Sequence, residues 1–233
     1  MIFIKYFILF FVYSIIGFFA ETIFCLIKTK KLMDRGFLIG PYLPIYGFGA
    51  LISIVYLTQY KDNIFTVFLL GVILCSILEY ITSYIMEKLF KARWWDYSNK
   101  AFNLNGRICG ENSLLFGMGA VAVIYLSQPL LDSLLNRIEP NVLIITSIIL
   151  LIVLLVDLIT SFNVITKVRK TITNLEVRKD STNEISKLVK ETIINNNKFL
   201  QKRLVSAFPD IKININKIKK TLEKDIKEML KKN

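Results

Sequence analysis

Long apolar stretches alternate with short charged pieces along most of the chain, and this pattern predicts transmembrane helices. Five stretches stand out, at about residues 2–27, 40–60, 64–86, 113–131 and 142–162. Blocks of about 20 apolar residues match a hydrocarbon core of roughly 30 Å, because each helical residue rises about 1.5 Å. A soluble domain would divide its apolar residues into shorter amphipathic runs. We therefore expect an all-α polytopic membrane protein with about five transmembrane helices.

The first apolar stretch resembles a cleaved signal peptide, but its details favour a retained anchor. Its only early basic residue is Lys5, it has no small-residue cleavage signature, and it is too long. Lys28, Lys30 and Lys31 follow it as a cluster that would stop translocation.

Basic residues lie almost entirely on one side of the predicted membrane. With five spans, the segments 28–36, 87–112 and the tail from 164 share a side and carry 4, 5 and 18 of the 30 lysines and arginines. The opposite side would carry Lys5, Lys61 and Arg137. Positive residues are retained in the cytoplasm. We therefore expect the N-terminus outside the cell membrane and the C-terminus in the cytoplasm.

The chain divides into a transmembrane helical domain, residues 1–163, and a basic cytoplasmic helical tail, residues 164–233. Apolar residues recur every three or four positions from 211 to 229, which predicts an amphipathic helix. An earlier helix should cover about 185–208 and end before Pro209. The two helices could pack against each other as a hairpin, and contact with anionic lipid or a partner subunit is the alternative.

Composition excludes several classes of chemistry. The formal charge of +12 could indicate nucleic acid, but its placement beside apolar spans favours a membrane protein. The chain has no histidine, which removes the commonest zinc ligand and the serine–histidine or cysteine–histidine dyads. Its three cysteines lie far apart and imply no disulfide framework. No G-x-x-x-x-G-K-[ST] phosphate loop is present, so the chain is not an ATPase of that class. We expect no cofactor.

Three acidic residues fall within the predicted spans: Glu21, Glu79 and Asp157. A charge at mid-helix costs roughly 2.5–3.5 kcal/mol on insertion scales and is usually functional or paired. Counting residues from the span ends places all three in the cytoplasmic half, at about 1.5 Å per residue. We expect a polar cavity that opens to the cytoplasm. Hydrogen bonding between helices, or contact with nearby lysine and arginine, is the alternative without a ligand.

The predicted connector 87–112 combines charged, amide and aromatic side chains that a plain loop would not need. Trp94 and Trp95 fit the headgroup layer, and two arginines could pair with the buried acids or hold a phosphate. The candidate substrate-binding residues are therefore Glu21, Glu79, Glu87, Arg93, Asp96, Asn105, Arg107 and Asp157. An interfacial loop without a ligand is the alternative.

The connector and the segment near residue 40 also carry a family resemblance. The stretches are Gly40-Pro41, Pro44–Ala50, Glu79-Tyr80, Glu87–Phe90, Ala92–Ser98 with its Trp-Trp-Asp-Tyr-Ser block, Phe102–Cys109, Asn112–Leu115 and Arg203–Pro209. The chain resembles the CmpB-type family of putative ABC-transporter permeases. The Gly110-Glu111 pair departs from the apolar residues expected there. The resemblance implies a membrane subunit served by a separate ATPase, and five spans would imply a homodimer for a full pore.

These observations support a transporter or permease component as the leading hypothesis. Glu79 and Glu87 would contact a cation or polar substrate, while Arg93 and Arg107 would pair with them or bind an anionic group. A membrane-embedded enzyme that acts on lipid headgroups at the inner leaflet is one alternative, with Glu79 or Glu87 as the acid/base. A membrane scaffold that recruits partners through its tail is the other. No E-A-A-type coupling loop of bacterial importers is evident.

Overall fold

The protein is described by a computed structural model that covers residues 1–30, 36–90, 92–176 and 212–213. Its helices are α1 (Ile2–Thr29), α2 (Pro44–Leu57), the 3₁₀ helix η1 (Thr58–Tyr60), α3 (Ile64–Phe90), α4 (Gly110–Ala122), the π-helix η2 (Val123–Ser127), α5 (Gln128–Leu135) and α6 (Pro140–Glu176). Within these ranges the strands are two residues long each, β1 (Ala92–Arg93) and β2 (Lys212–Ile213). The expected all-α class is confirmed.

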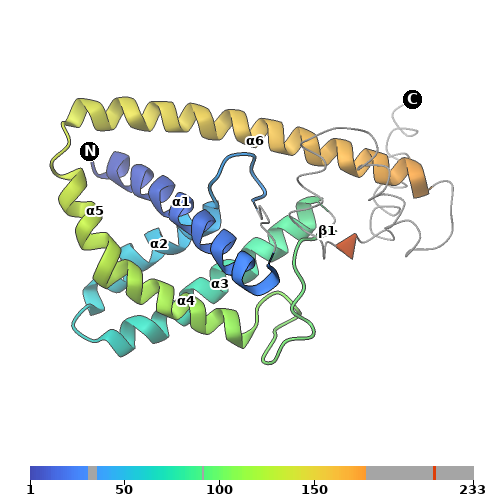
Figure 1. Cartoon of the computed structure of the whole chain (residues 1–233), viewed down its shortest axis with the longest axis horizontal. Helices are drawn as coiled ribbons and strands as arrows, with labels where there is room; N and C mark the ends of the chain where they lie inside the picture. The colour runs from blue at the N-terminus through green and yellow to red at the C-terminus, as the bar shows by residue number, and fades with distance from the viewer. Residues whose placement is uncertain (31–35, 91, 177–211, 214–233) are drawn as a thin grey trace, which may run out of the picture.

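Within the described residues, four helical segments are long and apolar enough to cross a bilayer. They are Ile2–Ile27, Ile64–Phe90, Gly110–Leu135 and Pro140–Val164. The third combines α4, η2 and α5 without a break. Figure 1 shows α6 lying along one side of the other helices and extending past them at one end. Four of the five predicted spans are therefore complete helices.

The second predicted span, 40–60, is built differently, because its helix begins only at Pro44 and follows an irregular segment. α2 has 14 residues and is about 21 Å long, and the preceding residues 37–43 are not helical. Pro41 and Pro44 explain this, because a proline disfavours helical backbone at the residue before it. The chain thus passes through the bundle as an irregular segment followed by a short helix.

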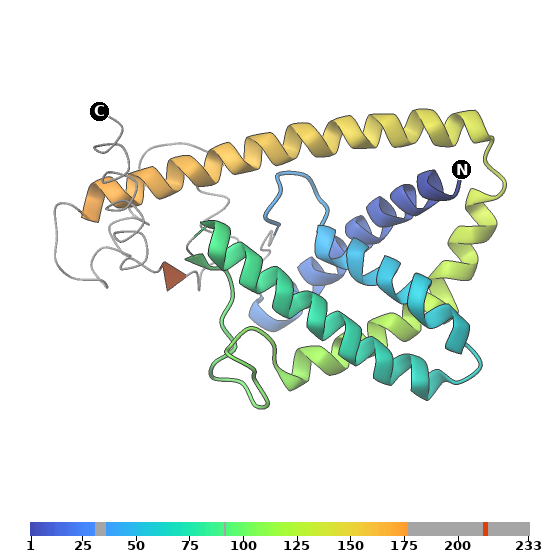
Figure 2. The same ribbon diagram turned by 180° about the vertical axis from the view of Figure 1, so that it is seen from behind.

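α2 begins beside the middle of α1 and runs back toward the start of α1. The Leu43 amide donates to the Ser14 carbonyl over 2.9 Å, and Gly47 lies against Ser14 and the Phe10 carbonyl. Ala50 and Ile54 then pack with Ile8 and Leu9 in one core cluster. Figure 2 shows α2 between α1 and α3. The irregular segment before α2 lies beside the middle of α1, where Leu38 and Tyr42 pack with Phe10 and Phe11.

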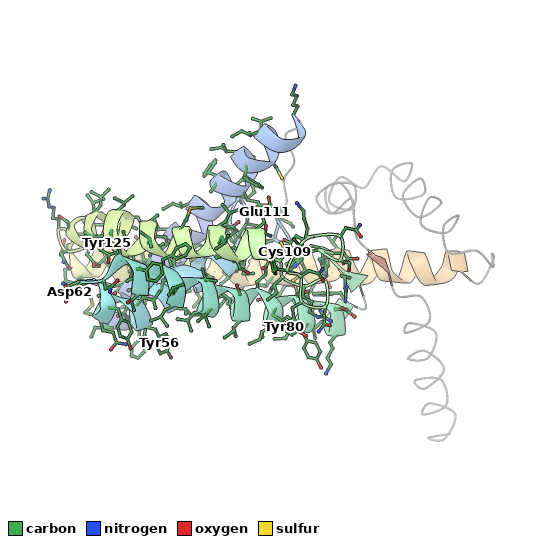
Figure 3. All side chains as sticks on the ribbon, turned by 90° about the horizontal axis from the view of Figure 1, so that it is seen from below. Tyr56, Asp62, Tyr80, Cys109, Glu111 and Tyr125 are labelled. Carbon is green, nitrogen blue, oxygen red and sulfur yellow. The ribbon has the colours of Figure 1, made fainter. Side chains whose placement is uncertain are left out.

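The helices alternate in direction, so their connections gather at two ends of the bundle. Lys5 Nζ donates to Asn136 Oδ1 over 2.6 Å, and the Tyr125 hydroxyl donates to the Lys61 carbonyl over 2.5 Å. The first contact joins the start of α1 to the residue after α5. The second joins η2 to the turn after η1. Figure 3 shows Asp62 and Tyr125 at this end, with Tyr80 and Cys109 toward the other.

α3 and α4 approach closely because small residues face each other. A Cβ atom added at Gly71 would lie 2.5 Å from the Ala120 Cβ, and the Gly117 Cα lies 3.5 Å from the same point. Gly119, on the same helix as Gly117, has no atom within 4 Å of its added Cβ. Packing therefore requires glycine at Gly71 but not at Gly119.

Substituting Gly71 with alanine should destabilise the bundle by about 1–3 kcal/mol, because two methyl groups would compete for one space. Gly119→Ala is the matched control, and we expect it to gain about 0.5–1 kcal/mol from helix propensity alone. Thermal unfolding of both variants in detergent checks this pair. Equal midpoints would contradict the close α3–α4 approach.

α6 is longer than the apolar pattern indicates. The predicted fifth span ends near Phe162 and the predicted tail begins at 164, but α6 continues to Glu176. No glycine or proline follows Phe162 before that residue, so nothing in the chain stops the helix there. The predicted tail helices at 185–208 and 211–229 lie outside the described residues, except Lys212 and Ile213. These two form β2, which pairs antiparallel with β1.

Candidate functional site

Glu79 lies in the second half of α3, and its carboxyl group is buried. Glu79 is 5% exposed. Its Oε1 accepts a hydrogen bond from the Tyr97 hydroxyl over 3.3 Å. Its Oε2 is buried without a hydrogen-bond partner of good geometry, although the Asn112 amide lies nearby. A buried carboxyl oxygen without a partner is uncommon in folded proteins, and it marks this position as a candidate site.

Tyr97 reaches Glu79 from the loop between β1 and α4. The Tyr97 amide donates to the Gly106 carbonyl over 2.8 Å, and Trp95 Nε1 donates to the Arg107 carbonyl over 3.0 Å. Asn105 and Gly106 adopt positive φ angles of 53° and 64°, which an Asn-Gly turn permits. A Cβ at Gly106 would also lie 2.5 Å from Asp96 Oδ1. The loop is thus a folded unit that presents Tyr97 to the bundle.

Glu21, on α1, approaches the same region through Tyr46 of α2. The Tyr46 hydroxyl donates to Glu21 Oε2 over 2.8 Å. Gly17 allows this arrangement, because a side chain there would overlap the Tyr46 Cβ and ring. Tyr46 stands in the third position of α2, so the irregular segment before α2 fixes where its hydroxyl reaches.

Glu21 and Glu79 both lie close enough to Tyr97 for their charges to act on its phenol. Burial raises the pKa of the Tyr97 phenol well above its ordinary value, and the negative charges of Glu79 and Glu21 raise this pKa further. The phenol therefore keeps its proton and acts as a hydrogen-bond donor to Glu79. We call Glu21, Tyr46, Glu79 and Tyr97 the Glu79 site. It draws on α1, α2, α3 and the loop before α4.

A second group of predicted residues forms an ion-pair network that we call the loop network: Glu87, Arg93, Asp96 and Arg107. Arg107 Nη2 contacts Glu87 Oε2 at 2.8 Å, and Arg93 Nε contacts the same oxygen at 3.4 Å. Arg93 Nη1 also lies 3.5 Å from Asp96 Oδ1. The network ties the 92–109 loop to the last turns of α3.

Arg107 is the most buried member of the loop network. Its Nη1 donates to the Ser83 hydroxyl over 3.2 Å, and its guanidinium lies 5.6 Å and 5.4 Å from the ring centroids of Tyr80 and Tyr84. Asn105 Nδ2 donates to the Tyr80 hydroxyl over 2.9 Å. Arginine over aromatic rings adds cation–π attraction to the ion pair. These contacts hold the loop against one face of α3.

Asp157 has a different set of partners from the other two acids in the spans. Its carboxylate accepts from the Ile39 and Gly40 amides at 2.8 Å each and from the Tyr42 hydroxyl at 2.6 Å. Ser161 Oγ on the same helix donates to it over 2.9 Å. Backbone without helical hydrogen bonds is tolerated at membrane depth only when such partners exist. Asp157 thus provides hydrogen-bond acceptors for the backbone amides of the irregular segment before α2.

The structure therefore divides the eight predicted site residues into three places. Glu21 and Glu79 approach each other through two tyrosines, five residues meet around the loop, and Asp157 holds the irregular segment. Tyr46 and Asn112 were missed from the predicted set, and Tyr97 was noted only as part of the connector. The Pro-Ile-Tyr-Gly stretch was a signal for Tyr46, because it contains a polar tip beside small residues.

A further polar network lies near the opposite end and was not predicted. The Tyr13 hydroxyl donates to Gln128 Oε1 over 2.9 Å and lies 3.1 Å from Ser127 Oγ. Gln128 Nε2 donates to Asp132 Oδ1 over 2.8 Å. The π-helix η2 precedes Gln128, and such local widening of a helix is not readable from hydropathy.

Among the described residues, no three histidine, cysteine, aspartate or glutamate side chains gather as metal ligands. What the Glu79 site offers is a set of oxygen donors: two carboxylates and two phenols, with an amide beside them. Such a set can bind a polar or positively charged group. It contains no activated nucleophile of the serine or cysteine type.

The similarity of this chain to known proteins is at the level of a protein family. No curated protein and no solved structure shows significant similarity to this chain. One protein family matches residues 8–162, which include α1 through most of the membrane part of α6 and the whole 92–109 loop. The match covers more than half of the chain. The protein therefore belongs to the CmpB-type family, whose description is putative ABC-transporter type IV.

Proposed function

We propose that this chain is the membrane-spanning component of a transporter and that the Glu79 site binds a polar solute on its path. The observation that carries the proposal is the Glu79 carboxyl group, 5% exposed, with one oxygen left without a good partner inside an apolar helix. A residue of this kind within a membrane span usually marks a substrate or ion pathway. The family description points to the same class of function.

The site faces the cytoplasm in this proposal. Lys5 and Lys61 belong to the end of the bundle that holds the N-terminus, whereas Lys88, Arg93 and Lys100 belong to the end that holds the Glu79 site. Basic residues are retained in the cytoplasm. The N-terminus would then lie outside the cell membrane, with α6 leading into a cytoplasmic tail that can meet anionic lipid.

A separate subunit would supply ATP hydrolysis, because the chain carries no phosphate loop. A homodimer would supply the remaining helices of a full pathway. Glu87, Arg93, Asp96, Asn105 and Arg107 would position the loop that brings Tyr97 to the site.

Comparison of solutes in cells and medium tests this function. Cells that express the full chain should differ from cells with an empty vector in at least one polar solute, measured by mass spectrometry. Glu79→Gln removes the charge with little change of shape and should abolish the difference. Glu111→Gln is the matched control, since Glu111 is half exposed and pairs with Lys100. No solute difference, or equal behaviour of both variants, would count against transport.

A further inference from the structure

Three basic residues of the described loop before α4 contact acids outside the Glu79 site. Arg107 contacts Glu87 at 2.8 Å, and Arg93 lies between Glu87 and Asp96 at 3.4 Å and 3.5 Å. Lys100 pairs with Glu111 at 2.7 Å. Within the described part of the connector, these positive charges are thus balanced by carboxylates outside the Glu79 site.

Among the described residues, the groups that contact the Glu79 carboxyl group are neutral. Tyr97 donates a phenolic hydrogen to Oε1, and the Asn112 amide lies beside the carboxyl group. Oε2 is buried and meets no donor of good geometry. The charge of Glu21 acts on the same phenol, which places a second negative charge in the neighbourhood.

Charge decides which kind of ligand this arrangement can accept. A buried carboxylate without a compensating positive charge is unfavourable by several kcal/mol. An anionic ligand would add repulsion, and a neutral ligand would leave the carboxylate uncompensated. A positive ligand removes the imbalance and supplies the interaction that Oε2 lacks. Carboxylate, phenol and amide oxygens are also the donors that hard cations and ammonium groups prefer.

We propose that the ligand of the Glu79 site is a cation, held by Glu79 Oε2 with the Tyr97 hydroxyl and the Asn112 amide as neighbouring oxygen donors. This inference rests on the proposed function and names the charge class of its solute. A free metal ion and the ammonium group of an organic solute share this chemistry. Tyr97 covers the carboxyl group from the loop, so movement of the 92–109 loop would open the way to Oε2.

The chain carries a natural optical reporter for the test. Its two tryptophans, Trp94 and Trp95, both lie in the loop that presents Tyr97, so their fluorescence follows the loop. The full chain in lipid nanodiscs is titrated with potassium chloride, magnesium chloride or methylammonium chloride, and separately with phosphate. A bulky organic chloride salt holds the ionic strength constant. The metal and methylammonium arms distinguish the two sources of positive charge.

We expect a saturable fluorescence change with at least one of the three cations and none with phosphate. Glu79→Gln should weaken that binding at least about tenfold, which corresponds to about 1.4 kcal/mol, while Glu111→Gln should bind like the wild type. Tyr97→Phe removes only the hydroxyl and should weaken binding several-fold. It provides a second test if the Glu79 variant does not fold.

Three results would overturn the inference: a saturable response to phosphate, a cation response that Glu79→Gln leaves unchanged, or no response to any of the three cations. The transport proposal fails separately. A solute difference in cells that depends on Glu79, together with silence of all cation titrations, would keep transport and remove the cation. Cation binding without any solute difference would keep the cation site and remove transport.

Discussion

Replacing Asp157 with alanine is expected to lower the free energy of unfolding by about 3–5 kcal/mol. The carboxylate accepts four hydrogen bonds, two of them from the Ile39 and Gly40 amides. Those amides have no helical partners, so alanine would leave them buried and unpaired. For a chain of this length, such a loss lowers the unfolding midpoint by about 6–20 °C.

Thermal unfolding in detergent, followed by helical circular dichroism, measures this effect. Asp157→Asn is the graded control, because its amide oxygen can still accept from one or two donors, and it should fall between alanine and the wild type. Tyr42→Phe removes only one of the four bonds and should cost less than either. An alanine variant as stable as the wild type would contradict the role of Asp157 in holding the irregular segment.

Replacing Arg107 with leucine is expected to release the 92–109 loop, at a cost of about 2–4 kcal/mol. Leucine keeps much of the bulk but removes the 2.8 Å contact of Arg107 with the Glu87 carboxylate. It also removes the donor to Ser83 and the contacts with the Tyr80 and Tyr84 rings. Since these contacts attach the loop to α3, Tyr97 should leave Glu79 together with the loop.

The thiol of Cys109 reports this release, because Cys109 is 1% exposed and is the last residue of the loop. In a background with Cys25 and Cys75 changed to serine, a thiol reagent should modify Cys109 at least about tenfold faster in Arg107→Leu, because that local stabilisation is lost. Lys100→Leu removes an exposed ion pair from the same loop and should leave the rate unchanged. Equal rates in all three proteins would show that Arg107 does not hold the loop.

Much of the fold could be predicted from the spacing of apolar residues. The long helices follow from uninterrupted apolar blocks, because satisfying backbone groups inside a bilayer requires a helix. The two prolines and the glycines near residue 40 predict an irregular helix entry there, but they do not identify the partner of its amides. That partner is Asp157, 117 positions after Gly40 in sequence, which accepts two of the amide hydrogens. The predicted fifth span, 142–162, agrees with the apolar part of α6, Pro140–Val164, but hydropathy does not give the end of the helix, whose backbone continues to Glu176.

The candidate site was predicted in part for a related reason. Residue counting gives the depth of an acid along its helix but does not give the side of the bundle that it faces. Glu79 and Asp157 have the same estimated depth, yet one meets Tyr97 and the other meets residues 39–42. The arginines were expected either to pair with the buried acids or to hold an anionic group, and in the structure they contact Glu87 and Asp96.

The length of α6 has a mechanical consequence. Its 37 residues form a rod of about 55 Å, and Asp157 lies close to the midpoint, about 26 Å from Pro140 and about 28 Å from Glu176. The Asp157 hydrogen bonds thus join α6 to the irregular segment near the middle of the rod. A tilt of the rod about this point swings its two ends in opposite directions by about half an ångström per degree. A force that tilts α6 from its Glu176 end would therefore move the opposite end, beside the N-terminus of α1, in the reverse direction.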